Sequence, residues 1–205
     1  TNAAKIHHLL RFEPQDQRSR NKNVTTFDAA LWESREERDF YLAVGSNTGS
    51  SLFETNYDYV KENFAELSKK GSSKAATTWF DRSRLRKVVK VNCRTLDDVL
   101  AELNHPFPYH FLKVDTQGAE FQILRGAENF LKTDCAGLYL ELFTLPIFKG
   151  ATLLPEVVRY LDGLGFDLIK KYPSEATFAA ANDCLFLKRG ANDIARTVRD
   201  VYEID

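Results

Sequence analysis

The sequence predicts an α/β protein whose sheet is twisted and mostly parallel. Apolar segments typical of buried strands alternate along the chain with segments in which apolar residues recur at helical spacing. The clearest unit is the apolar run Tyr109–Leu112, which leads to Asp115 and is followed by Leu124, Ala127 and Leu131 at helical spacing. The rest of the chain is interpreted around this strand-to-helix corner.

The other elements follow from the same two periodicities. The predicted strands are Lys5–Phe12, Val24–Leu31, Arg38–Val44, Val88–Cys93, Tyr109–Asp115, Ala136–Leu142, Phe166–Lys171 and Cys184–Lys188. The predicted helices are Tyr57–Leu67, Leu96–Leu103 with Thr95 as its N-cap, Gly118–Leu131, Thr152–Leu164 and Asn192–Tyr202. The terminal helix could pack on its neighbour or on a second subunit, which would make the protein a homodimer.

Two acids lie at the ends of central strands. Asp115 ends one predicted strand, and Glu141 lies near the end of the next. Ligands bind outside the carboxyl ends of strands in open α/β sheets, and Asp is also a good helix N-cap, so either role is open to Asp115. On neighbouring strands the two acids would share one cleft, where they could orient an acceptor hydroxyl, bind a divalent metal or share a proton. Alternatively, one of them only holds backbone amides.

Length and composition exclude several classes of protein. The 205 residues predict one domain, residues 1–205, and a formal net charge of −1 provides no basic field for nucleic acid. No apolar run approaches the roughly 18 residues of a membrane span, and residues 1–20 lack the apolar segment of a signal peptide. Cys93, Cys135 and Cys184 are odd in number and widely spaced, which predicts reduced thiols in a cytoplasmic protein, without disulfides or a metal site.

Residues 53–86 have a different character from their surroundings. The stretch Trp79–Lys87 mixes aromatic and basic residues, a combination that can bind phosphate or stack on a base or a sugar ring. We favour the simpler interpretation of a mobile, exposed insertion. Its length also suggests a lid or an acceptor-recognition segment.

The corner carries a family resemblance. The stretch Lys113–Ala127, KVDTQGAEFQILRGA, resembles the signature of the FkbM-type S-adenosylmethionine-dependent methyltransferases. Further motifs occur in the family's order between about Leu9 and Arg189, and the likeness is weakest between roughly Asn56 and Arg86. These motifs are Arg11–Pro14, Asp28–Leu31, Gly49–Leu52, Thr95–Leu100, Leu138–Glu141 and Asn182–Leu187.

The resemblance implies a Rossmann-like fold, with helices on both faces of the sheet and a closing antiparallel hairpin. It implies S-adenosylmethionine as the cofactor and methyl transfer to an oxygen of a small-molecule or sugar-like acceptor. It also places Ser50 and Ser51 near the mouth of the active site, where either could touch substrate.

The same resemblance implies roles for individual residues. Glu13 would hold the ribose hydroxyls, Asp28 would accept from the adenine amine, and Ala29 would offer a flat apolar contact. Without the resemblance, Glu13 is a surface carboxylate in a turn and Asp28 a strand-end turn residue. Asp115 would lie by the cofactor and the reacting centre, as a base or an acceptor-orienting group. Either Gln117 or Glu141 would help it.

One expected motif is missing from this chain. A Rossmann-like methyltransferase binds its cofactor on a glycine-rich loop after the first strand, and no such loop precedes Lys5. We therefore expect the first strand and helix to lie upstream of these residues. Two alternatives remain open: a nucleotide-dependent oxidoreductase, and a Rossmann-like interaction module that has lost cofactor binding.

Overall fold

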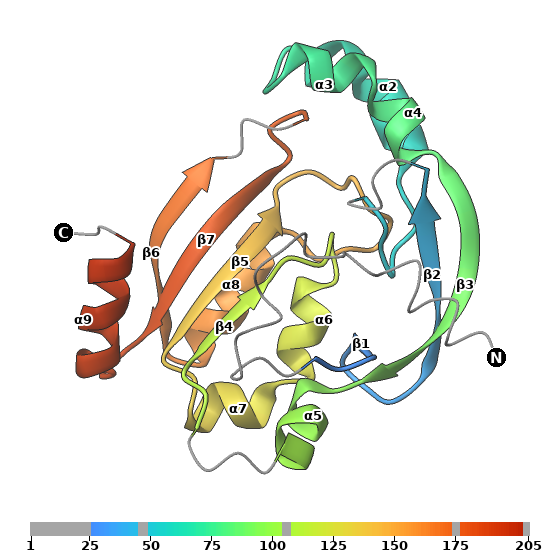
Figure 1. Ribbon diagram of the computed structural model, residues 1–205. Helices are drawn as coiled ribbons and strands as arrows, with labels where there is room; N and C mark the ends of the chain where they lie inside the picture. The colour runs from blue at the N-terminus through green and yellow to red at the C-terminus, as the bar shows by residue number, and fades with distance from the viewer. Residues whose placement is uncertain (1–25, 45–48, 104–107, 174–176, 203–205) are drawn as a thin grey trace, which may run out of the picture.

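The computed structural model describes residues 26–44, 49–103, 108–173 and 177–202 and has a mixed α/β fold (Figure 1). Its strands are β1 (Ala30–Leu31), β2 (Glu37–Ala43), β3 (Leu85–Arg94), β4 (Phe111–Val114), β5 (Gly137–Phe143), β6 (Phe166–Pro173) and β7 (Ala181–Lys188). Its helices are α2 (Tyr57–Leu67), α3 (Ser73–Thr77), α4 (Trp79–Ser83), α5 (Leu96–Leu103), α6 (Glu120–Arg125), α7 (Glu128–Thr133), α8 (Leu154–Gly163) and α9 (Asn192–Val201). The α/β class predicted from the sequence is confirmed.

Hydrogen bonds join the described strands into two sheets. One sheet has the order β4-β5-β7-β6 and the other β1-β3-β2. The pairs β1–β3 and β4–β5 are parallel, whereas β2–β3, β5–β7 and β6–β7 are antiparallel. The expected closing hairpin is present as β6–β7. The pairing is more mixed than the mostly parallel arrangement predicted, because β7 enters between β5 and β6 as the second arm of that hairpin. The predicted strand Lys5–Phe12 lies outside the described residues.

Helices cover both faces of the four-stranded sheet, as expected. On one face, buried residues of α6, α7 and α8 form the main core with alternate residues of β5 and β7, among them Leu140 and Phe186. On the other face, α9 packs through Val198 against Leu185 and Leu187, and Figure 1 shows it beside β6 and β7. The terminal helix therefore packs on its own chain, and the homodimer stays a prediction.

The helix predicted over residues 118–131 is two short helices, α6 and α7. At the break, a Cβ on Gly126 would lie 2.1 Å from the carbonyl oxygen of Trp32, so only glycine permits this close approach. The second helix has its own cap, because the Asp97 carboxylate accepts from two backbone amides of its first turn at 2.9 Å each. Periodicity could not reveal the break, because the apolar spacing continues through it.

The insertion predicted for residues 53–86 is folded and partly buried. Its helix α2 spans Tyr57–Leu67 as predicted, and Val60 and Trp79 are buried with Phe148 and Phe178 in a second core. The segment is therefore not wholly exposed as predicted: Trp79 packs inward, whereas residues such as Lys74 and Asp81 are exposed. We call residues 57–83, which form α2, α3 and α4, the aromatic cap; Figure 1 shows these helices together at the top of the molecule.

Candidate functional site

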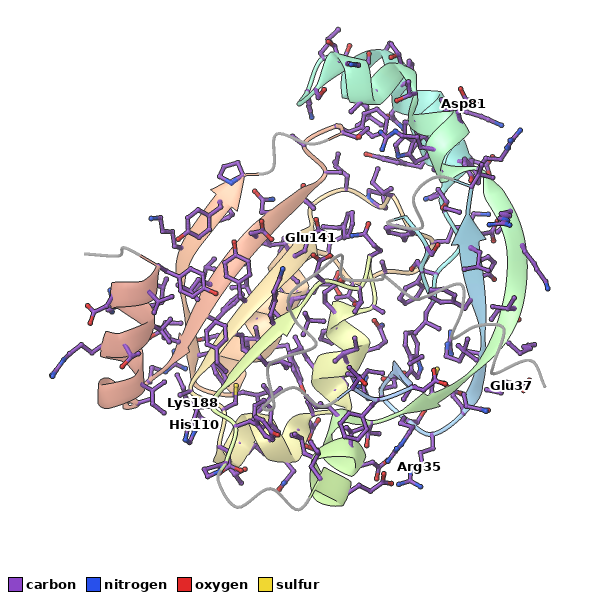
Figure 2. All side chains as sticks on the ribbon, viewed as in Figure 1. Arg35, Glu37, Asp81, His110, Glu141 and Lys188 are labelled. Atoms are coloured by element: carbon purple, nitrogen blue, oxygen red, sulfur yellow. The ribbon has the colours of Figure 1, made fainter. Side chains whose placement is uncertain are left out.

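The two predicted acids lie side by side at the carboxyl end of the central strands. In the parallel pair β4–β5, Val114 is the register partner of Leu140, so the residues that follow, Asp115 and Glu141, are neighbours. The side-chain amide of Gln117 donates to Glu141 Oε2 at 2.7 Å and to Asp115 Oδ1 at 3.3 Å. Figure 2 shows Glu141 towards one end of the sheet, with His110 and Lys188 at the opposite end. The structure thus brings together the three residues predicted as catalytic, and we call residues 115–120 together with Glu141 the acidic corner.

Asp115 is not the helix N-cap. Helix α6 begins at Glu120, and its N-cap position, Ala119, makes no side-chain capping bond. The Asp115 carboxylate is 47% exposed and lies 3.8 Å from the ammonium of Lys113. Of the two roles left open by the sequence, the structure is therefore consistent with a carboxylate that faces a ligand.

The group that organises the corner is Glu120, a residue that was not predicted to belong to the site. Its carboxylate is 3% exposed and accepts from the Thr116 amide at 2.8 Å, the Thr116 hydroxyl at 3.0 Å and the Gly118 amide at 2.9 Å. Burial raises the pKa of Glu120, while these hydrogen bonds oppose the rise. The feature of the sequence that could have identified Glu120 is its position as an acid in the first turn of a predicted helix, between residues of types that are usually buried.

The backbone of the corner is strained. Gln117 has a φ of +58° and Gly118 a φ of +103°, and the first value is unfavourable for a side chain of this kind. Gly118 also lies close to other residues, since a Cβ there would be 3.1 Å from Phe148 Cδ2. A left-handed Gln117 followed by glycine turns the chain sharply enough to point the amide back at Glu141.

The two serines predicted near the active-site mouth are buried and bind backbone. Ser50 is 8% exposed and its hydroxyl accepts from the Ala43 amide at 3.1 Å. Ser51 is 1% exposed, and its hydroxyl donates to the Gln117 carbonyl at 2.7 Å. Direct contact with substrate is therefore the wrong role for Ser51, whose hydroxyl instead holds the corner.

The electrostatics of the corner centre on Glu141. Burial, followed by the charges of Asp115, Glu120 and Asp183, raises the pKa of this carboxyl to about 7, and the Gln117 hydrogen bond opposes the rise. A carboxyl with such a pKa is partly ionised at neutral pH. It can therefore both accept and return a proton, which is the property of a general base.

Asp183 is a further acid at this site that the sequence analysis left unassigned within its motif. It lies on β7 directly opposite Glu141 in the antiparallel register. Burial and the charge of Asp115 raise the pKa of Asp183, whereas Lys113 and a hydrogen bond from Tyr139 lower it. Like charges placed directly across a sheet are destabilising, so this pairing carries a cost in stability.

The predicted adenine residues, Asp28 and Ala29, do not lie at the end of a strand. The described strand is only Ala30–Leu31, so the exposed Asp28 and the half-buried Ala29 precede β1, and their prediction at the end of a strand is wrong. The reason is the short parallel pairing with β3, which begins at Ala30. Glu13 lies outside the described residues.

The described residues contain no group of three His, Cys, Asp or Glu side chains arranged to hold a metal ion. The three cysteines are free and buried. Within the same residues, no helix is long and apolar enough to cross a membrane.

Fold and corner together define an α/β protein with an acidic site at the carboxyl edge of its sheet. The family described as the methyltransferase FkbM domain matches residues 2–168, and the chain belongs to this family. The protein is therefore a methyltransferase at the level of its family. Neither the curated proteins nor the solved structures contain a match to the chain.

Proposed function

We propose that the protein transfers a methyl group from S-adenosylmethionine to an oxygen of a small-molecule or sugar-like acceptor. The observation that carries the proposal is the Asp115–Gln117–Glu141 constellation at the strand ends of an FkbM-family chain. Open α/β sheets bind their ligands at this edge.

The charge of the corner fits the cofactor. S-adenosylmethionine carries a sulfonium and an ammonium group, and it supplies an electrophilic methyl group when bound. Burial is the main cause of the raised pKa of Glu141, and the charges of Asp115, Glu120 and Asp183 raise it further, so a cation would relieve the excess negative charge at the site. Asp115, exposed at the edge, is the residue we assign to the cofactor here, with Glu13 for the ribose and Asp28 and Ala29 for the adenine.

The chain's own residues prepare the acceptor. Glu141, with a pKa of about 7, accepts the proton that an acceptor hydroxyl loses. Gln117 holds the Glu141 carboxylate in one orientation and leaves Asp115 facing outward. The contribution of these groups is alignment and proton transfer, which together account for a large part of many enzymatic rate enhancements.

The second core, in which Phe143 and Phe148 pack with Val60 and Trp79 of the aromatic cap, supports an acceptor-recognition role. Phe143 follows Glu141 by two residues on β5 and packs edge-on against Phe148, with ring centroids 5.3 Å apart. Phe148 also lies against Gly118 of the corner. We therefore propose that the aromatic cap forms a fixed apolar wall beside the acidic corner, which would suit a ring-shaped acceptor such as a sugar.

The three free cysteines support a reducing compartment, and we propose that the protein is cytoplasmic.

The test is calorimetric titration of the full-length gene product with S-adenosylhomocysteine, alongside Glu13→Ala and a matched control, Glu37→Ala. Glu37 is an exposed carboxylate at the start of β2, labelled in Figure 2. We expect binding by the parent chain and the control, and weaker binding by Glu13→Ala. Absence of binding by the folded full-length protein would favour the interaction module, and binding indifferent to Glu13 would show that the ribose is placed wrongly.

A further inference from the structure

A serine side chain joins the loop after β2 of the three-stranded sheet to the acidic corner. Ser51 follows β2 and pairs with Tyr41 of that strand, through amide-to-carbonyl bonds of 2.8 and 3.1 Å. The Ser51 hydroxyl accepts from the Phe53 amide at 2.9 Å and donates to the Gln117 carbonyl at 2.7 Å. One buried hydroxyl therefore links the loop after β2 to the turn that follows β4.

The residue at the far end of this link needs support. Gln117 holds a φ of +58°, a backbone conformation that residues other than glycine, asparagine and aspartate disfavour. Because the Ser51 hydroxyl binds the Gln117 carbonyl, it stabilises the peptide in this orientation. If the φ of Gln117 relaxed to a negative value, the side chain would point in a different direction from Glu141.

The direction of the Gln117 side chain matters because of what surrounds Glu141. The groups facing that carboxylate are acids from three elements: Asp115 after β4, Glu120 on α6 and Asp183 on β7. Lys113, the nearby cation, lies 3.8 Å from Asp115 and above the ring of Tyr139. Among the described contacts of Glu141, the Gln117 amide is the donor that favours the ionised form.

We propose that Ser51 is a positioning residue for Glu141. It holds Gln117 in the left-handed conformation, and Gln117 in turn donates to the Glu141 carboxylate and orients it towards the acceptor. The catalytic consequence rests on the proposed function, whereas the link from Ser51 through Gln117 to Glu141 rests on the contacts alone.

The test follows the titration of Glu141 by NMR in protein carrying ¹³C-labelled glutamate, with Glu141→Gln used to assign its resonance. In Ser51→Ala we expect the midpoint to rise by roughly half a pH unit or more, because a hydrogen bond to the ionised form is weakened. The matched control is Ser50→Ala, which removes the neighbouring buried hydroxyl that binds the Ala43 amide instead of Gln117. We expect the control to leave the midpoint unchanged.

A double variant separates positioning from general destabilisation. If Ser51 acts through Gln117, then Ser51→Ala has no further effect on the midpoint in a Gln117→Leu background. An equal shift in that background, or an equal shift in Ser50→Ala, would overturn the proposal. If Ser51→Ala does not fold, Gln117→Leu serves as the test. A Glu141 midpoint that does not rise in Gln117→Leu would contradict the link from Ser51 through Gln117 to Glu141.

The two proposals fail in different ways. A shifted Glu141 midpoint without binding of S-adenosylhomocysteine would support the positioning role and contradict the proposed function. Binding of S-adenosylhomocysteine with an unchanged Glu141 midpoint would support the proposed function and contradict the positioning role of Ser51.

Discussion

The acidic corner and the aromatic cap meet at β5, but they are held together by opposite means. At the corner, polar groups are strained or crowded: Gln117 is left-handed, Glu120 is buried, and Glu141 faces other acids. In the aromatic cap, Trp79 packs edge-on against Phe80 with centroids 4.9 Å apart and lies 5.5 Å from Phe178. The cap gains stability from apolar burial, whereas the corner carries costs in backbone strain and like-charge repulsion.

Phe148 shows how the two regions depend on each other. It is buried in the core of the cap and also lies against Gly118, so the strained turn is packed against an apolar surface. Strained backbone persists when its surroundings over-determine it. The comparison shows that apolar packing around the aromatic cap supports the strained, polar turn at the acidic corner. The following predictions test that division.

The largest expected effect is on catalysis. Glu141→Gln keeps the size of the side chain and its contact with Gln117 but removes the group that accepts a proton, so we expect methyl transfer to fall by roughly 10²- to 10⁴-fold. Binding of S-adenosylhomocysteine should change little. The measurements are turnover with an acceptor found by screening and calorimetric titration, with Glu37→Gln as the exposed control. Full activity in Glu141→Gln would show that the acidic corner takes no part in methyl transfer.

The next effect is on stability, and it belongs to the aromatic cap. Trp79→Ala removes a buried indole from the second core, so we expect the free energy of unfolding to fall by about 3–5 kcal/mol. Chemical denaturation measures this loss, and Lys74→Ala, at an exposed position of α3, is the matched control. If Trp79→Ala lost only as much stability as the control, the cap would not be a packed unit.

A smaller effect is expected in the pH dependence of stability. The folded pKa of Glu141 is about 7, against an ordinary value of 4.5, so the folded state binds more protons between these values. The contribution of Glu141 to stability is therefore fully present below pH 4.5 and is lost as the pH rises through about 7. Allowing for partial exposure, we expect a loss on the order of 1 to 2 kcal/mol.

Thermal unfolding of the parent chain and of Glu141→Gln at several pH values isolates this contribution. The difference in stability between the two should grow in favour of the variant as the pH rises from 4.5 to above 7. A difference that stays constant over this range would mean that Glu141 titrates normally.

The smallest effect concerns a helix end far from the chemistry. Asp97→Ala removes the carboxylate that caps α7, and we expect a loss of about 0.5–2 kcal/mol. Asp98→Ala is the neighbouring control, because it breaks an exposed ion pair with Arg35 and should cost less. Urea denaturation of both variants compares them. A larger loss in Asp98→Ala would contradict the assignment of the cap.

Several features followed from the sequence because they are local. Helices α2 and α5, the Thr95 N-cap and the two C-terminal strands have periodicities or capping residues within a few positions of each other. The neighbouring placement of Asp115 and Glu141 also followed, because parallel strands end at the same edge of a sheet.

Other features were decided by contacts between distant segments. The break between α6 and α7 depends on Trp32 and Asp97, and the burial of Trp79 depends on Phe178. The role of Ser51 depends on Gln117, a residue 66 positions away. None of these contacts changes the local apolar periodicity of the sequence around the residue that it affects, so the periodicity could not predict it.

By itself, the sequence determined the α/β class, the family and the acidic strand ends. It could do so because apolar period, strand-to-helix order and an extended motif are properties of neighbouring residues. Only the tertiary structure decided that Glu120 organises the corner, that Gln117 is left-handed and that Glu141 has a pKa of about 7. Burial and the approach of charges from other strands produce these properties, and both arise only when the chain folds.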